Sequence, residues 1–158
     1  MTKRFHPDHT PEGSALTSLM LEIFRVNGAL LEAGDALTRE IGLTSARWQV
    51  LGAVAMAVEP RPVAYLARSM GLTRQSVQRV VDDLKAEGFL AQAPNPHHKR
   101  AWLILLTDKG RQAYDAAIDC EVPWANRLAQ GLTETQIETA LAVLKQLRKE
   151  LAMQGDPV

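Results

Sequence analysis

The sequence has one cysteine, no net charge and no long apolar run. The single Cys120 excludes an intramolecular disulfide and indicates a reducing compartment. No apolar segment approaches the ~20 residues that a membrane span needs, and residues 1–13 do not resemble a signal peptide. We therefore expect a cytoplasmic protein that makes no contact with a membrane.

Motifs that carry catalysis are also missing from the sequence. It has no nucleophile elbow, no glycine loop that cradles phosphates and no carboxylate pair placed for acid–base chemistry. Its histidines do not have metal-ligand spacing, because His6 and His9 lie in the N-terminal segment whereas His97 and His98 are adjacent in a loop. We expect neither an enzyme nor a bound cofactor or metal.

The zero net charge argues mildly against a nucleic-acid partner, but the charges are unevenly distributed. Between residues 60 and 102 there are seven basic and three acidic side chains, so the rest of the chain is acidic. A basic middle segment in a neutral protein is compatible with a local surface that faces phosphates.

Apolar periodicity predicts a mainly α fold with a small β-hairpin. After a flexible arm, residues 1–13, the spacing of apolar residues predicts a helix from Ser14 to about residue 41, and a second helix over 45–58. Prolines at positions 60 and 62 end the second helix. Two further helical stretches fill residues 108–153, and we expect Pro123 to kink or break the first of them.

The middle segment has the pattern of a helix-turn-helix followed by a hairpin. A short helix over 63–70 ends at Gly71, and Thr73 caps a longer helix that runs to about Glu87. An extended segment, a basic tip at 94–101 and the strand-forming segment 101–106 then predict a β-hairpin.

The longer helix and the hairpin tip are the candidate DNA-binding surface. An Arg side chain can bond to both N7 and O6 of guanine, and a Gln side chain to both N6 and N7 of adenine. Hydroxyl groups at the start of a helix can bond to phosphate oxygens. A polar helix face alone favours a plain solvated helix, but a basic hairpin directly after the helix pair favours DNA contact. The candidate residues are Thr73, Arg74, Gln75, Ser76, Gln78, Arg79, His97, His98, Lys99 and Arg100.

At several points the sequence resembles the MarR family of bacterial transcription regulators, over roughly residues 16–151. The residues that carry the resemblance are Leu66-Ala67, Gly71-Leu72-Thr73, Val80-Val81-Asp82-Asp83-Leu84, Glu87-Gly88-Phe89-Leu90, Asn95-Pro96, Lys99-Arg100-Ala101 and Leu106-Thr107-Asp108-Lys109-Gly110. One departure concerns the hairpin tip, where His98 replaces the family's usual Asp and Lys99 replaces an Arg. The resemblance implies that this change removes an internal salt bridge of the wing.

The resemblance implies a MarR-type domain over residues 14–153. Its winged helix-turn-helix would span about 44–106, and its dimerisation helices about 14–41 and 108–153. The implied partners are a palindromic operator in double-stranded DNA, a second copy of the chain, and a small aromatic or phenolic effector that relieves repression.

Other features leave alternative interpretations open. An effector pocket could include Met20, Phe24, Trp48 and Met56, although such side chains at helical spacing are more often core. A winged helix used only for protein contacts is a second hypothesis. A redox sensor that uses Cys120 is a third, but no adjacent Arg or His activates this thiol and a packed side chain is favoured.

Overall fold

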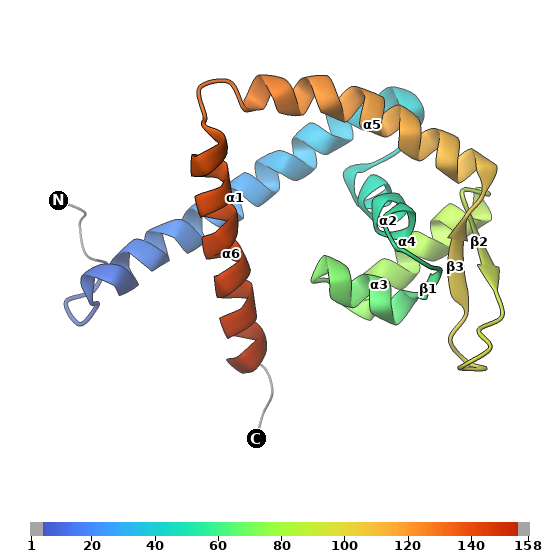
Figure 1. Ribbon diagram of the computed structural model, residues 1–158, viewed down its shortest axis with the longest axis horizontal. Helices are drawn as coiled ribbons and strands as arrows, with labels where there is room; N and C mark the ends of the chain where they lie inside the picture. Colours follow the sequence, from blue (N-terminus) through green and yellow to red (C-terminus); the bar gives the residue numbers. More distant parts are fainter. Residues whose placement is uncertain (1–4, 155–158) are drawn as a thin grey trace. The chain divides into compact units, whose positions relative to one another are not determined.

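The computed structural model describes residues 5–154 of the chain, which divides into two compact units, residues 1–120 and 121–158. Most of the described residues are helical, and the first unit also holds a small antiparallel sheet (Figure 1). In chain order the elements are α1 Pro11–Thr38, the 3₁₀ helix η1 Arg39–Ile41, α2 Ser45–Ala55, β1 Arg61–Pro62, α3 Val63–Met70, α4 Arg74–Ala86, β2 Leu90–Ala93, β3 Leu103–Leu106, α5 Asp108–Leu128 and α6 Glu134–Gln154.

The hydrophobic core of the first unit lies among α2, α3, α4 and the sheet. Leu51, Leu66 and Leu84 are its largest fully buried side chains, one from each of these three helices. Along α4, Val77, Val81 and Leu84 are buried, at the spacing of one helix face. The opposite face of α4 is thereby directed outward.

The turn between α3 and α4 is built from the residues that the sequence pattern identified. Gly71 adopts a left-handed conformation with φ of 68°, and the N–H of Leu72 donates to the Ala67 carbonyl at 2.9 Å. Thr73 then caps α4 by accepting a hydrogen bond from the N–H of Ser76 at 3.2 Å. The expected bounds of both helices are confirmed.

The predicted hairpin belongs to a three-stranded sheet with the order β1-β3-β2. The edge strand β1 was not predicted, because its two residues were interpreted only as a break. Arg61 precedes a proline and so favours extended backbone, and Pro62 can occupy an edge strand because it has no N–H to place in a ladder. The return strand begins at Leu103 rather than Ala101.

Thr107 and Gly110 hold the start of α5 against the segment that follows α4. The Thr107 hydroxyl donates to the Gly88 carbonyl at 2.7 Å, and its oxygen accepts from the Gly110 N–H at 3.0 Å. A side chain at position 110 would overlap the carbonyl oxygen of Phe89, so the backbones approach closely only because Gly110 has no Cβ.

Two expected helix boundaries were wrong, and α5 is not broken at its internal proline. The first helix begins at Pro11 under a Thr10 cap, so residues 11–13 are not part of an arm and Ser14 is buried inside the helix. The second helix ends at Ala55, three residues earlier than expected. Of the two expected effects of Pro123, a kink or a break, the break is wrong, because α5 continues to Leu128.

Helices α1 and α6 each leave apolar side chains exposed. By length and composition alone, residues 11–41 could cross a membrane, which the sequence did not lead us to expect. Only 6% of that apolar window is buried, and the window includes the ion pair of Glu22 and Arg25. The exposed apolar residues of α6 include Ile137, Leu141, Val143, Leu144 and Leu151.

Candidate nucleic-acid interface

The outward face of α4 presents the polar side chains that the sequence singled out. Arg74, Gln75, Ser76 and Arg79 are exposed and Gln78 is half-buried, because the opposite face packs into the core. The Thr73 and Ser76 hydroxyls bond within the first turn, where the Ser76 hydroxyl donates to the Thr73 carbonyl at 3.0 Å. Both hydroxyls thus stabilise the helix start.

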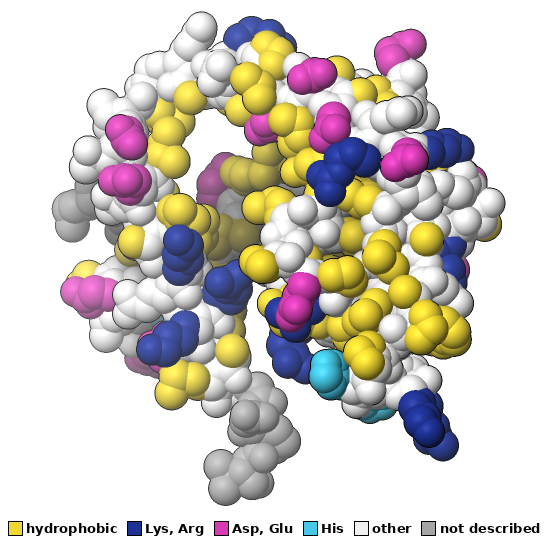
Figure 2. All heavy atoms as spheres, turned by 45° about the vertical axis from the view of Figure 1, so that its right-hand side comes forward, with side chains coloured by type: hydrophobic (Ala, Val, Ile, Leu, Met, Phe, Trp, Pro, Cys, Tyr) yellow, Lys and Arg dark blue, Asp and Glu magenta, His cyan; other side chains and the backbone are white. Residues whose placement is uncertain are grey.

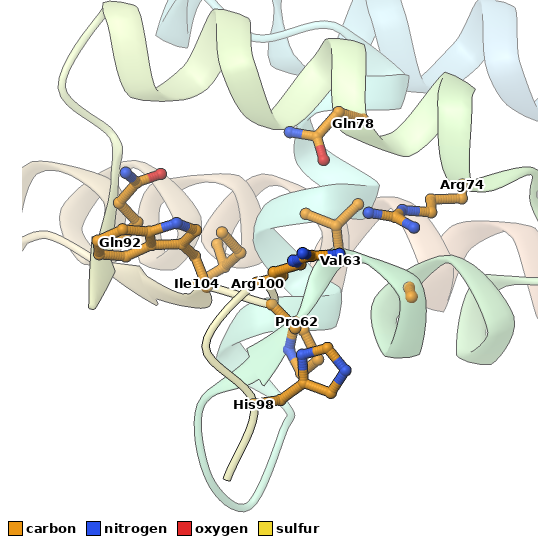
Figure 3. Close-up of a pocket in the computed structure, with 11 residues that line it drawn as sticks. Pro62, Val63, Arg74, Gln78, Gln92, His98, Arg100 and Ile104 are labelled. Atoms are coloured by element: carbon orange, nitrogen blue, oxygen red, sulfur yellow. The ribbon is translucent and has the colours of Figure 1, made fainter. Parts of the chain in front are cut away.

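A groove of about 570 Å³ separates α4 from the hairpin (Figure 3). Arg74 and Gln78 of α4 point into it from one side, and His98 and Arg100 come from the hairpin tip. Pro62, Val63 and Ile104 form part of its apolar wall. The structure therefore brings four predicted residues, from two separate segments, to one concave surface.

Short-range hydrogen bonds within residues 95–101 hold the hairpin tip. The N–H of His97 donates to the Asn95 side-chain oxygen at 2.9 Å, and the N–H of Ala101 donates to the His98 carbonyl at 3.0 Å. Within residues 5–154, no ion pair braces the tip. Lys99 and Arg100 are exposed, and Figure 2 shows His and Lys or Arg side chains together at the end of the hairpin.

His97 does not line the groove that His98 lines. It borders a second hollow with Arg61 and Tyr65, where the Arg61 guanidinium lies 4.6 Å from the Tyr65 ring centroid. Glu59 pairs with Arg61 at 2.8 Å, so this hollow carries a neutralised cation. The two adjacent histidines therefore serve different surfaces.

A polar chain joins α4 to the hairpin beside the groove. The Gln78 amide nitrogen donates to Asp82 Oδ1 at 3.0 Å, and Lys85 Nζ lies 3.8 Å from the same oxygen. Lys85 Nζ also donates to the side-chain oxygen of Gln92 on β2. This chain was not predicted from the sequence, although the spacing of four residues between Gln78 and Asp82 is a recognisable helical pair.

Trp102 also lines the groove, which was not predicted from the sequence. It was interpreted as part of the return strand, yet its side chain is 47% exposed and lines the groove with Gln92 and Ile104. An aromatic side chain at a strand end next to a basic tip is the signal that could have identified it.

An ion pair at the other end of α4 ties the helix to its neighbours. Arg47 Nη2 of α2 lies 2.6 Å from Glu87 Oε1, and this close guanidinium lowers the pKa of the Glu87 carboxyl. Lys109 Nζ donates to the Glu87 carbonyl at 2.7 Å and lies over the Phe89 ring. No local pattern indicates this contact, since its residues come from three elements.

The four candidate effector residues differ in their surroundings. Trp48 packs against the core, whereas the side chains of Phe24 and Met56 are 73% and 79% exposed. Met20 is partly buried on α1. None of the four lines the grooves beside the hairpin, and their role as a pocket stays a prediction.

Cys120, His6 and His9 do not line the groove between α4 and the hairpin. Cys120 is half-buried on α5. The His6 and His9 rings are 6.3 Å apart, and the described part of the chain contains no group of three or more potential ligands that could hold a metal.

Comparison with known proteins gives the same family at the level of sequence. A model described as MarR family matches residues 41–101. An uncharacterized protein of Mycobacterium tuberculosis is 32% identical over 132 residues, which cover 84% of this chain and 91% of the relative. The transcriptional activatory protein BadR of Rhodopseudomonas palustris is 25% identical over 99 residues, 61% of this chain and 57% of BadR.

Solved structures share the fold at lower identity. A mutant MarR of Escherichia coli complexed with operator DNA has a TM-score of 0.74 and 22% identity, covering 84% of this chain and 95% of that chain. CouR of Rhodococcus jostii, bound to p-coumaroyl-CoA, has a TM-score of 0.71 and 23% identity, covering 82% of this chain and 90% of that chain.

Proposed function

Because the chain belongs to the MarR family of DNA-binding transcription regulators, we propose that it binds a palindromic operator as a homodimer. The observation that carries this proposal is the groove in which Arg74 and Gln78 of α4 face His98 and Arg100 of the hairpin. The Gln78 amide and the Arg74 guanidinium, which can contact base edges, are placed there beside the hairpin's Arg100 and His98, which can contact phosphates.

In this proposal α4 is the recognition helix and enters the major groove with its N-terminal half. Arg74 and Arg79 can each bridge guanine N7 and O6, and Gln75 and Gln78 can pair with adenine. Thr73 and Ser76 lie at the helix start, where phosphate oxygens are favoured by the helix dipole. The exposure of this face supports these roles.

The hairpin is the wing and supplies contacts to the DNA backbone. Lys99 and Arg100 are exposed and form no ion pair within the described residues, so both charges are free for phosphate. His97 and His98 extend the same tip, and each lines a different hollow. These contacts position the protein without reading sequence.

The homodimer is supported by the apolar side chains that α1 and α6 leave exposed. Leu21, Phe24 and Leu30 of α1 are between 39% and 73% exposed, and α6 carries a similar set. A second copy that covers them would remove apolar surface from water. We assign dimerisation to residues 14–41 and 108–153, and the winged helix-turn-helix to residues 44–106.

The proposed regulator acts in the cytoplasm as a repressor that a small aromatic or phenolic molecule releases from DNA. The p-coumaroyl-CoA complex of CouR supports such an effector, whereas BadR is an activatory relative, so the sign of regulation needs its own test. The proposed effector residues are Met20, Phe24, Trp48 and Met56.

A salt-dependent shift assay on duplex DNA tests the proposal. Binding should weaken steeply with salt, and Arg100→Ala should flatten the dependence by about one unit of log–log slope, because one phosphate contact is lost. A winged helix used only for protein contacts would give no shift at low salt. Transcription from a promoter that carries the bound site, with and without the protein, then separates repression from activation.

A further inference from the structure

We propose that Asp82, held by Lys85, is a positioning residue that fixes the amide of Gln78 in the orientation needed to read adenine. The inference rests on the proposed function and adds a specificity determinant to it. It concerns the polar chain from Gln78 through Asp82 and Lys85 to Gln92.

The chemistry of Asp82 determines which end of the Gln78 amide faces it. An ionised carboxylate only accepts hydrogen bonds, so the group of Gln78 that lies 3.0 Å from Asp82 Oδ1 must be the amide NH₂. The oxygen of the amide and its second N–H remain available. Adenine offers the matching pair in the major groove, because its N6 amino group donates and its N7 accepts.

Lys85 and Gln92 restrict where the Asp82 carboxylate can lie. Lys85 is one turn further along α4, and its ammonium lies 3.8 Å from Asp82 Oδ1 while it donates to Gln92 Oε1 on β2. Because Lys85 is anchored on the strand at the base of the wing, Asp82 is held from two sides. Figure 3 shows Gln78 directed into the groove and Gln92 at the edge of it, on the hairpin.

Ordering the Gln78 side chain before binding should sharpen base selection. Immobilising a side chain with many rotamers costs about 0.5–1.5 kcal/mol at an interface, equivalent to roughly two- to tenfold in affinity. With Asp82 present, much of this cost is met before DNA arrives. Only adenine forms both hydrogen bonds with the ordered amide, so Asp82 should raise the preference for adenine as well as the affinity for DNA.

Asp83 provides a matched control for Asp82. The two residues are adjacent, both are exposed, and both border the same face of α4 as Arg79. Within the described residues the Asp83 side chain forms no hydrogen bond or ion pair. Asp82→Asn and Asp83→Asn therefore remove the same charge from the DNA-facing side, but only the first exchanges the acceptor of Gln78 for a group that can also donate.

The test measures base preference at every operator position with the full-length protein. Gln78→Ala first identifies the position that Gln78 reads, as the one where the preference is lost. Asp82→Asn should lower the adenine preference there by about two- to tenfold, whereas Asp83→Asn should leave the wild-type profile. On sequences that lack the selected adenine, both variants should bind more tightly to a similar degree, because each loses one negative charge.

The possible failures are distinguishable. If Asp82→Asn keeps the wild-type preference, or Asp83→Asn changes the same position equally, Asp82 does not position Gln78. If Gln78→Ala changes no position, the role of Gln78 in reading is wrong. If the wild type selects no sequence at all, the proposed function itself fails.

Discussion

Glu87 caps the C-terminal end of α4 and also ties this helix to α2. Its carboxylate lies 2.6 Å from Arg47 Nη2, and the side chain of Arg47 is only 17% exposed. The Arg47 guanidinium also donates to the Gly42 carbonyl at 3.2 Å, next to η1. This residue pair therefore links the C-terminal end of α4 to the segment that follows α1.

The stabilisation from Glu87 should depend on pH. Since Arg47 lowers the pKa of Glu87 below its ordinary value of 4.5, the ion pair stabilises the fold above that pH and is lost as the pH falls through the lowered pKa. In urea unfolding, wild type should be more stable than Glu87→Gln at pH 7, and the difference should shrink below about pH 4. A difference that stayed constant down to pH 3 would contradict this account.

Among the elements, the junction of α4, β2 and α5 depends on the absence of a side chain at Gly110. Gly110→Ala would place a Cβ against the carbonyl oxygen of Phe89, and we expect it to lower the free energy of unfolding by about 1–3 kcal/mol or more. Denaturant unfolding measures the change.

Gly52→Ala is the matched control for that prediction. Its added Cβ would meet only Tyr114 Cε2 at 3.5 Å, which is an ordinary contact. Because alanine favours the helix over glycine, this variant should be neutral or more stable by up to about 1 kcal/mol. Equal destabilisation by both variants would show that space at position 110 is not the cause.

The elements that could be predicted from the sequence are those that local chemistry determines. Gly71 as the end of α3 and Thr73 as the cap of α4 placed these two helices correctly. Strand β1 was missed because two residues become a strand only by pairing with β3. The early end of α2 likewise has no clear local signal.

For the candidate site, too, the sequence predicted what depends on local residue types and not what depends on packing. The residues of α4 and the wing were identified from their types and spacing, and four of them meet in one groove. The Arg47–Glu87 pair and the exposed indole of Trp102 were missed, because they depend on how distant segments pack. Gln78 was among the predicted DNA contacts, but its hydrogen-bond partner Asp82 was not.

At the scale of the whole molecule, dimerisation should be required for tight operator binding. Leu141 of α6 is 47% exposed in the single chain, and a charge placed there would be buried in the proposed interface. Leu141→Glu should shift the mass in sedimentation toward the monomer and weaken operator binding by an order of magnitude or more.

Gln146→Glu adds the same negative charge at another exposed position of α6. This control separates the loss of the apolar contact from a general charge effect on DNA binding. If both variants stayed dimeric with wild-type affinity, Leu141 would lie outside any interface.

Operator binding by a homodimer is best tested by selecting bound sequences from a random duplex library with the purified full-length protein. The α4 helices of the two copies should meet successive major grooves, so we expect an enriched palindrome with half-site centres about one helical turn, roughly 10 base pairs, apart. A library that returns no enriched sequence, or only a single half-site, would contradict this expectation.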